Sequence, residues 1–280
     1  EQISVEIAPG GSGANSMIGI SQLGGTSAFS GKIGRDEHGK LYREKLEALG
    51  VSDCLAEGEG ATGSSLILVS EDGARTMNTF LGMSQELMNP DIDPDIIQSS
   101  KYLYLTGYLW DTESQKKAVL NALDEAKKRE IKVALSLSDP FCVTRHKEDF
   151  INLLKGYVSM VFCNQEEAFT LLDTKITQKA VETLSDWTET VALTIGAYGA
   201  LISHHGGTCY IDPLPVRVED TTGAGDAFAA GFLYGMTHNM SPLDSGRIGA
   251  TLAAAVIGQT GPRYLGNVRK LIQEKQGIIL

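Results

Sequence analysis

From about residue 100 to its end, the chain alternates short apolar segments with amphipathic ones, and this alternation limits the possible folds more than any other feature. Residues 102–106, 131–137, 157–163 and 190–195 have the length and apolar character of buried strands. Helical periodicity marks residues 114–129, 146–154, 165–172, 226–237, 242–258 and 268–275. Strands that alternate with helices form parallel sheets covered by those helices. The sequence therefore predicts an α/β domain with a mostly parallel central sheet.

Composition excludes several classes of protein. A chain of 280 residues with 42% hydrophobic content buries the core of one large domain easily and leaves room for a small appendage. The net charge of −11, with dispersed lysines and arginines, argues against a nucleic-acid partner. No apolar run approaches the roughly 20 residues of a membrane span. The four cysteines, Cys54, Cys142, Cys163 and Cys209, lack metal-binding spacing, which predicts free buried thiols in a reducing cytoplasm rather than a zinc site or a disulfide framework.

The region before residue 100 has a different pattern. Residues 64–70 and 75–81 are extended segments joined by a Glu-Asp-Gly turn, which predicts a β-hairpin. Residues 2–8 also have the pattern of a strand. Strands within about residues 1–9 and 62–82 are expected to form a small antiparallel sheet. Two interpretations stay open: a lid that shuts water out of a transfer site, or an edge extension of the main sheet.

The segment 220–226, Asp-Thr-Thr-Gly-Ala-Gly-Asp, lies where a predicted helix begins. A helix N-terminus carries unpaired N–H groups and a partial positive charge. Gly223, Ala224 and Gly225 are therefore predicted to form an anion hole for phosphate oxygens, and Asp226 is placed to take the proton of an attacking hydroxyl. The alternative is a helix cap after a tight turn. The run is richer in glycine than a cap requires, which favours the catalytic interpretation.

A second Gly-rich segment, residues 9–16, precedes a predicted helix over 16–23. Gly10 and Gly11 allow close approach of the backbone to a ligand, and Asn15 offers both a donor and an acceptor to a diol. A simple turn that caps the helix is the alternative. The segment also contains an incomplete dinucleotide fingerprint, because its third glycine is replaced by Ser16. The alternative function, a nicotinamide-dependent dehydrogenase, is supported by that weak signal alone.

Polar residues also follow two of the predicted strands. Asn164 and Glu167 open a helix, where acidic residues usually serve the helix dipole, yet an amide and a carboxylate at a strand end also suit hydrated Mg²⁺ and its phosphates. The next strand ends at Thr194, Gly196 and Gly199. This segment either contacts a nucleotide phosphate or forms a simple turn. The Walker A pattern and the protein-kinase motifs are absent from the sequence. Any phosphoryl transfer must therefore use a different apparatus.

With these motifs, the chain resembles the ribokinase-like (PfkB) family of sugar and nucleoside kinases nearly from end to end. The resemblance rests on residues 10–15, 23–25, 31–36, 164–167, 194–199 and above all 220–226. Within the family, residues 76–82, 107–111, 136–139 and 258–263 are similar to the bacterial adenosine-kinase-like branch. The resemblance implies a three-layer α/β/α sandwich with a mostly parallel sheet and a small β-sheet lid, in a single kinase domain.

The resemblance also implies an activity and a set of roles. ATP and Mg²⁺ are the expected co-substrates, a monovalent cation stays open, and a primary hydroxyl of adenosine, or of ribose, fructose or a related sugar acid, is the expected acceptor. The implied base is Asp226, with the anion hole at Gly223, Ala224 and Gly225. Gly10, Gly11 and Asn15 would bind the acceptor; Asn164, Thr194, Gly196 and Gly199 would bind ATP; Glu167 would organise Mg²⁺ through water.

One departure from the family pattern concerns the N-terminus. Members begin with a core strand that carries an Asp for the sugar diol, and this strand is expected to be missing from the given chain. A homologue that binds ligands without catalysis is disfavoured by the intact Asp226. Whether the protein is a monomer or a homodimer stays open.

Overall fold

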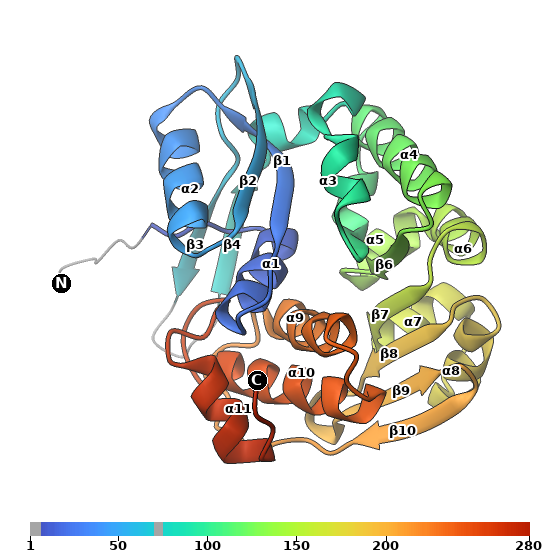
Figure 1. Cartoon of the computed structure of the whole chain (residues 1–280). Helices are drawn as coiled ribbons and strands as arrows, with labels where there is room; N and C mark the ends of the chain where they lie inside the picture. Colours follow the sequence, from blue (N-terminus) through green and yellow to red (C-terminus); the bar gives the residue numbers. More distant parts are fainter. Residues whose placement is uncertain (1–6, 70–74) are drawn as a thin grey trace.

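The computed structural model describes residues 7–69 and 75–280, and its centre is a six-stranded sheet (Figure 1). The strand order is β10-β9-β8-β7-β6-β5, in which β5 to β8 run parallel and β9 and β10 are antiparallel at one edge. The strands are β5 (Tyr102–Thr106), β6 (Lys132–Ser136), β7 (Met160–Asn164), β8 (Thr190–Thr194), β9 (Ala200–His204) and β10 (Gly207–Ile211). The predicted mostly parallel sheet is confirmed.

Helices cover both faces of this sheet. Alternate strand residues such as Leu135 and Val161 pack into one core, against α4 (Glu113–Lys128), α6 (Lys147–Gly156), α7 (Gln165–Leu172) and α8 (Thr177–Ser185). Their neighbours Ala134 and Phe162 face the other core, formed with α9 (Ala224–Thr237), α10 (Pro242–Ile257) and α11 (Val268–Gln276). Side chains of a strand point to alternate faces, so these two cores make the predicted α/β/α sandwich.

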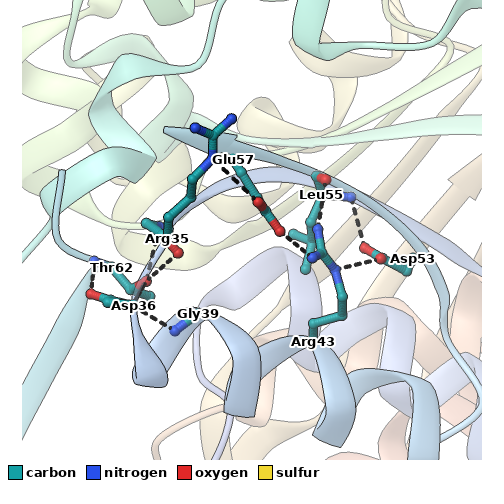
Figure 2. A network of polar contacts seen from close by, with 9 residues as sticks. Arg35, Asp36, Gly39, Arg43, Asp53, Leu55, Glu57 and Thr62 are labelled. Atoms are coloured by element: carbon teal, nitrogen blue, oxygen red, sulfur yellow. Dashed lines mark hydrogen bonds and ion pairs between the residues drawn. The ribbon is translucent and has the colours of Figure 1, made fainter. Parts of the chain in front are cut away.

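The N-terminal part adds a parallel pair of strands that the sequence patterns did not predict. It contains α1 (Ser12–Gln22), β1 (Ala28–Gly34), α2 (Glu37–Ala48) and β2 (Ser52–Gly58), with β1 and β2 paired in a sheet of their own. Most residues of these strands are only half-buried or exposed, so their apolar periodicity is weak. Arg43 of α2 forms ion pairs with two residues of β2, Asp53 at 2.6 Å and Glu57 (Figure 2).

Asp36 joins this part to the segment that leads into the hairpin. Its carboxylate caps α2 through the N–H of Gly39 at 2.8 Å and accepts the hydroxyl of Thr62 at 2.6 Å and its N–H at 2.8 Å (Figure 2). The Thr62 hydroxyl, followed by the two N–H groups, lowers the pKa of Asp36 to about 2. Asp36 therefore stays ionised at neutral pH and holds the root of the hairpin.

The hairpin itself forms a third sheet. Strands β3 (Ser64–Val69) and β4 (Arg75–Phe80) pair antiparallel with each other and not with any other strand of the described residues, which confirms the small antiparallel sheet. Its apolar side chains Leu66, Leu68 and Phe80 are exposed. The predicted strand over residues 2–8 falls almost wholly outside the described residues, and Ile7 and Ala8 are not in a strand.

Short helices complete the connections, and some boundaries differ from expectation. The remaining elements are α3 (Pro94–Gln98), α5 (Pro140–Arg145), η1 (Gly82–Glu86), η2 (Asn89–Asp91), η3 (Gly107–Trp110) and η4 (Gly196–Tyr198). Helix α1 begins at Ser12 rather than at residue 16, because packing against α9 offsets the poor helix propensity of its Gly and Ser residues. Within the described ranges, no helix is long and apolar enough to cross a membrane. The four cysteines, all within those ranges, are free thiols, but only Cys142 and Cys163 are buried as predicted, while Cys54 and Cys209 are half-buried.

Candidate active site

The N-terminus of α9 has the conformation that an anion site needs. Gly223 caps the helix with φ 79°, and a Cβ at that position would lie 2.4 Å from the carbonyl oxygen of Pro262, so only glycine fits. Among the described residues, the N–H groups of Gly223, Gly225 and Asp226 have no hydrogen-bond partner, whereas that of Ala224 donates to the Thr221 carbonyl at 3.2 Å. A Cβ on Gly225 would point into open space. Two of the three predicted anion-hole residues thus offer free donors.

Asp220 fixes the loop that leads into this helix. Its side chain is buried and accepts the N–H groups of Thr222 at 2.9 Å and Gly261 at 2.8 Å. A buried carboxylate that joins two loops holds the backbone around Gly223 in place. The sequence patterns indicated Asp220 only as part of the motif. Its signal was an acidic residue at the start of a Gly-rich turn, where a side chain often bonds to the backbone two residues on.

Asp226 is half-buried in the first turn of α9, and α1 supplies its partners. Ser12 donates to its Oδ1 at 2.5 Å and Asn15 to its Oδ2 at 3.0 Å. Burial raises the pKa of Asp226, while these two hydrogen bonds act in the opposite direction. The helices approach closely because Gly19 faces Ala230, where a Cβ on Gly19 would lie only 2.7 Å from the Ala230 Cβ.

The predicted acceptor residues take two different positions. Gly10 and Gly11 are exposed, with no protein atom within 4 Å of a Cβ placed on either. The hydroxyl of Tyr42 fixes this segment by donating to the Gly10 carbonyl at 2.9 Å. Asn15, in contrast, belongs to α1 and not to the loop, and its Oδ1 is buried. In this structure Asn15 therefore contacts Asp226 and does not present its acceptor atom to a diol.

The predicted nucleotide residues lie at the ends of β7 and β8. Asn164 and Thr194 are direct neighbours in the parallel register of these strands. Gly196, at φ 54°, borders open space. At Gly199 the fold itself requires glycine, because the φ is 82° and a Cβ would lie 2.1 Å from the Ile211 carbonyl oxygen. Gly196 therefore remains open to a ligand, whereas both polar atoms of the Asn164 side chain are hydrogen-bonded to Glu167.

Glu167 is buried and forms a reciprocal capping box with Asn164. The Asn164 N–H and side-chain amide donate to its two oxygens at 2.9 and 2.7 Å, and its own N–H donates to Asn164 Oδ1 at 2.8 Å. Burial, with the charges of Asp139 and Glu166 adding, raises the pKa of Glu167 to about 7. A buried carboxylate near a second one suits a cation. No group of three metal-binding side chains occurs in the described ranges, and Mg²⁺ commonly needs only one or two carboxylates plus phosphates.

Tyr104 contacts Ser16 of α1, whose hydroxyl also donates to the backbone carbonyl of Asp226. It is partly buried on β5, with its hydroxyl 3.4 Å from Ser16 Oγ. Burial raises the pKa of Tyr104, and the charges of Asp226 and Glu167 raise it further. Neither Tyr104 nor Ser12 was predicted as a site residue. Both occur in ordinary apolar or small-residue patterns, and only the packing of α1 between β5 and α9 brings them to Asp226.

The end of β6 contributes a further group, which the sequence indicated only through the family resemblance. Ser138 has φ 77°, unusual for a residue with a side chain, and its hydroxyl accepts the Gly107 N–H at 2.8 Å. Asp139 then caps α5 through the Cys142 N–H at 2.7 Å. Strain and a carboxylate thus occur together at the strand end next to Asn164, beside the residues predicted to bind phosphate.

The three-layer fold with its separate hairpin is ribokinase-like. A probable sugar kinase from Rhizobium etli superposes with a TM-score of 0.91 at 36% identity, covering 96% of this chain and 83% of that one. An adenosine kinase from Sinorhizobium meliloti gives 0.90 at 36% identity, covering 95% and 83%. An uncharacterized sugar kinase from Archaeoglobus fulgidus is 30% identical over 251 residues, 88% of this chain and 97% of the relative.

Residues 1–267 match the pfkB family carbohydrate kinase. The chain belongs to this family. It is a PfkB-type kinase, with relatives named as sugar kinases and as a nucleoside kinase.

Replacing Glu167 by Gln is expected to remove a pH dependence of stability. The folded protein keeps the Glu167 proton up to about pH 7, whereas the unfolded chain loses it near 4.5. The wild-type free energy of unfolding should therefore fall, relative to Glu167→Gln, as pH rises through that window, by about 3 kcal/mol in all. Urea unfolding of both proteins at pH 5 and pH 8, with a chelator present, measures this difference. An equal change in both proteins would contradict the burial of a neutral Glu167.

Proposed function

We propose that the protein transfers the γ-phosphate of ATP to a primary hydroxyl of a nucleoside, with adenosine as the favoured acceptor. The observation that carries the chemistry is the N-terminus of α9, where free N–H groups at Gly223 and Gly225 lie beside the Asp226 carboxylate. The N–H groups stabilise charge on the transferred phosphoryl group. Asp226 accepts the proton of the attacking hydroxyl, so that the new O–P bond forms as the bond to ADP breaks.

Nucleotide and metal are assigned to the ends of β7 and β8. Asn164 and Thr194, side by side, and the open backbone at Gly196 would bind ATP. Glu167 would hold Mg²⁺ through water, and the ion, when bound, neutralises charge on the phosphates. The raised pKa of Glu167 supports this role, since burial and then the charge of Asp139 disfavour its ionised form, and a bound cation would offset both. The β3–β4 hairpin is proposed as the lid over the acceptor, within a single kinase domain.

Adenosine is favoured by two lines of support. The S. meliloti adenosine kinase is 36% identical over nearly the whole chain. Residues 136–139, which resemble the adenosine-kinase-like branch, also lie at the end of β6, the strand beside β7, and Ser138 accepts the N–H of Gly107 there. A sugar acceptor is the second candidate, because the R. etli and A. fulgidus relatives are named as sugar kinases.

A panel assay separates the two candidates. Purified protein is incubated with ATP and Mg²⁺ and with adenosine, other nucleosides, ribose or fructose, and ADP release is measured. Adenosine is expected to give a kcat/KM at least about 10²-fold above that of either sugar, because a site built for a base leaves polar groups unpaired when the base is absent. Turnover of sugars alone would contradict the nucleoside proposal while leaving the kinase chemistry intact.

A further inference from the structure

Both oxygens of the Asp226 carboxylate are held by one turn of a distant helix. Ser12 Oγ donates to Oδ1 at 2.5 Å and Asn15 Nδ2 to Oδ2 at 3.0 Å, across 214 and 211 residues of chain. In the described ranges no other side chain donates to this carboxylate. Each carboxylate oxygen has two lone pairs, so one on each oxygen stays open for a proton. The two contacts therefore fix the direction of the carboxylate without using up its basic positions.

The Ser12 hydroxyl makes no hydrogen bond within its own helix that would explain its position. Ser12 is the first residue of α1, and the helix is capped by Gly11 without any side-chain hydrogen bond. Because Gly11 and not Ser12 is the N-cap residue, the Ser12 hydroxyl is not needed to cap the helix. Here its hydroxyl points across to α9 and makes a short hydrogen bond to an acid, the kind of contact that is strongest when the acid is ionised.

The Asn15 side chain is likewise oriented toward Asp226 and not toward a partner in its own helix. Its Oδ1 is buried without a hydrogen-bond partner in the described ranges, while its Nδ2 donates to Asp226. The opposite orientation of the amide would place an oxygen against the carboxylate, which repels it. Leaving a buried acceptor unpaired costs about 1–3 kcal/mol. The contact to Asp226 therefore decides how Asn15 is oriented.

We propose that Ser12 is a positioning residue for Asp226, with Asn15 as its second support: the Ser12 hydroxyl aims the carboxylate at the acceptor hydroxyl and keeps it ionised. This inference rests on the proposed function, because a fixed direction and charge matter only if Asp226 is the base. A positioning contact of this kind acts on the chemical step and leaves ATP binding alone. A purely structural contact would act on folding instead.

Ser12→Ala tests the inference, with Ser12→Thr as the conservative variant and Ser21→Ala, at the far end of α1, as the matched control. Ser12→Ala is expected to lower kcat about 10-fold to 100-fold with the KM for ATP unchanged. The acid limb of its pH–rate profile should move up by about one pH unit, because the variant loses a hydrogen bond to the ionised acid. Ser12→Thr should restore both quantities, and Ser21→Ala should match the wild type.

Two outcomes would overturn the inference. An unchanged kcat and acid limb in Ser12→Ala would show that the hydroxyl does not act on Asp226. Equal losses in Ser12→Ala and Ser12→Thr, with lowered unfolding temperatures, would assign Ser12 to packing. Asp226→Asn, assayed alongside, separates this failure from that of the proposed function: if Asp226→Asn is inactive, only the role of Ser12 is lost, and if it is active, the assignment of the base is lost.

Discussion

Asp226→Asn is expected to lower kcat by about 10²-fold to 10⁴-fold, the scale of lost general-base catalysis. The amide has nearly the shape of the carboxylate, and its oxygen can still accept from Ser12 or Asn15, so folding and ATP binding should change little. Without a basic oxygen, however, the attacking hydroxyl keeps its proton. ADP release with saturating acceptor measures kcat, and calorimetric titration measures ATP binding.

Asp186→Asn is the control for this substitution. Asp186 is an exposed residue at the end of α8, on an element that contributes no residue to the site, so its loss should leave kcat within about twofold of the wild type. A similarly small effect for Asp226→Asn would remove Asp226 from the mechanism. The Gly-rich turn would then be a cap and an anion site without a base.

Gly225→Ala is expected to lower kcat/KM by about 10²-fold while the protein stays at least as stable as the wild type. No protein atom lies within 4 Å of a Cβ at this position, so the fold accepts alanine, which also favours the helix. The added methyl group points into the space assigned to phosphate oxygens, and moving them away from the N–H groups removes stabilisation on the scale of one oxyanion-hole contact. Thermal unfolding and ADP release measure the two effects.

Gly156→Ala is a matched substitution at another open position. Gly156 also lies in a helix, with nothing within 4 Å of a Cβ placed on it, and it ends α6, away from the N-terminus of α9. It should gain the same stability and keep full activity. Equal activity of the two alanine variants would mean that no ligand approaches Gly225.

The elements that could be predicted from the sequence are mainly those whose residues are buried. The strands β6 to β8 are almost wholly buried in their inner part, and β5, although half-buried in its first three residues, is apolar throughout that part, so an apolar run marks each of them. Strands β1 and β2 were not predicted because most of their residues are half-buried or exposed and charged side chains such as Arg43 and Glu57 border them. The start of α1 was placed four residues late, because glycine and serine predict a loop until packing against α9 is known.

In the candidate site, too, local motifs could be predicted from the sequence, whereas contacts between distant residues could not. The position of Gly223 and Asp226 at the start of a helix was predictable, because a Gly-rich turn before an apolar helix is a local pattern with a local cause, and their roles in catalysis stay a prediction. The partnership of Ser12 with Asp226 was not, since it joins residues 214 positions apart and depends on how closely Gly19 lets α1 approach α9. Asn15 was assigned to the acceptor because its amide offers a donor and an acceptor, and the structure shows that its donor contacts Asp226; its binding of the acceptor stays a prediction.

A crystal structure with adenosine, Mg²⁺ and a non-hydrolysable ATP analogue tests the central claim most directly. We expect the γ-phosphate oxygens to accept hydrogen bonds from the N–H groups of Gly223 and Gly225, and the 5′-hydroxyl to lie within hydrogen-bond distance of Asp226. A γ-phosphate bound away from the N-terminus of α9, or an acceptor hydroxyl that meets another residue in place of Asp226, would contradict the proposed mechanism.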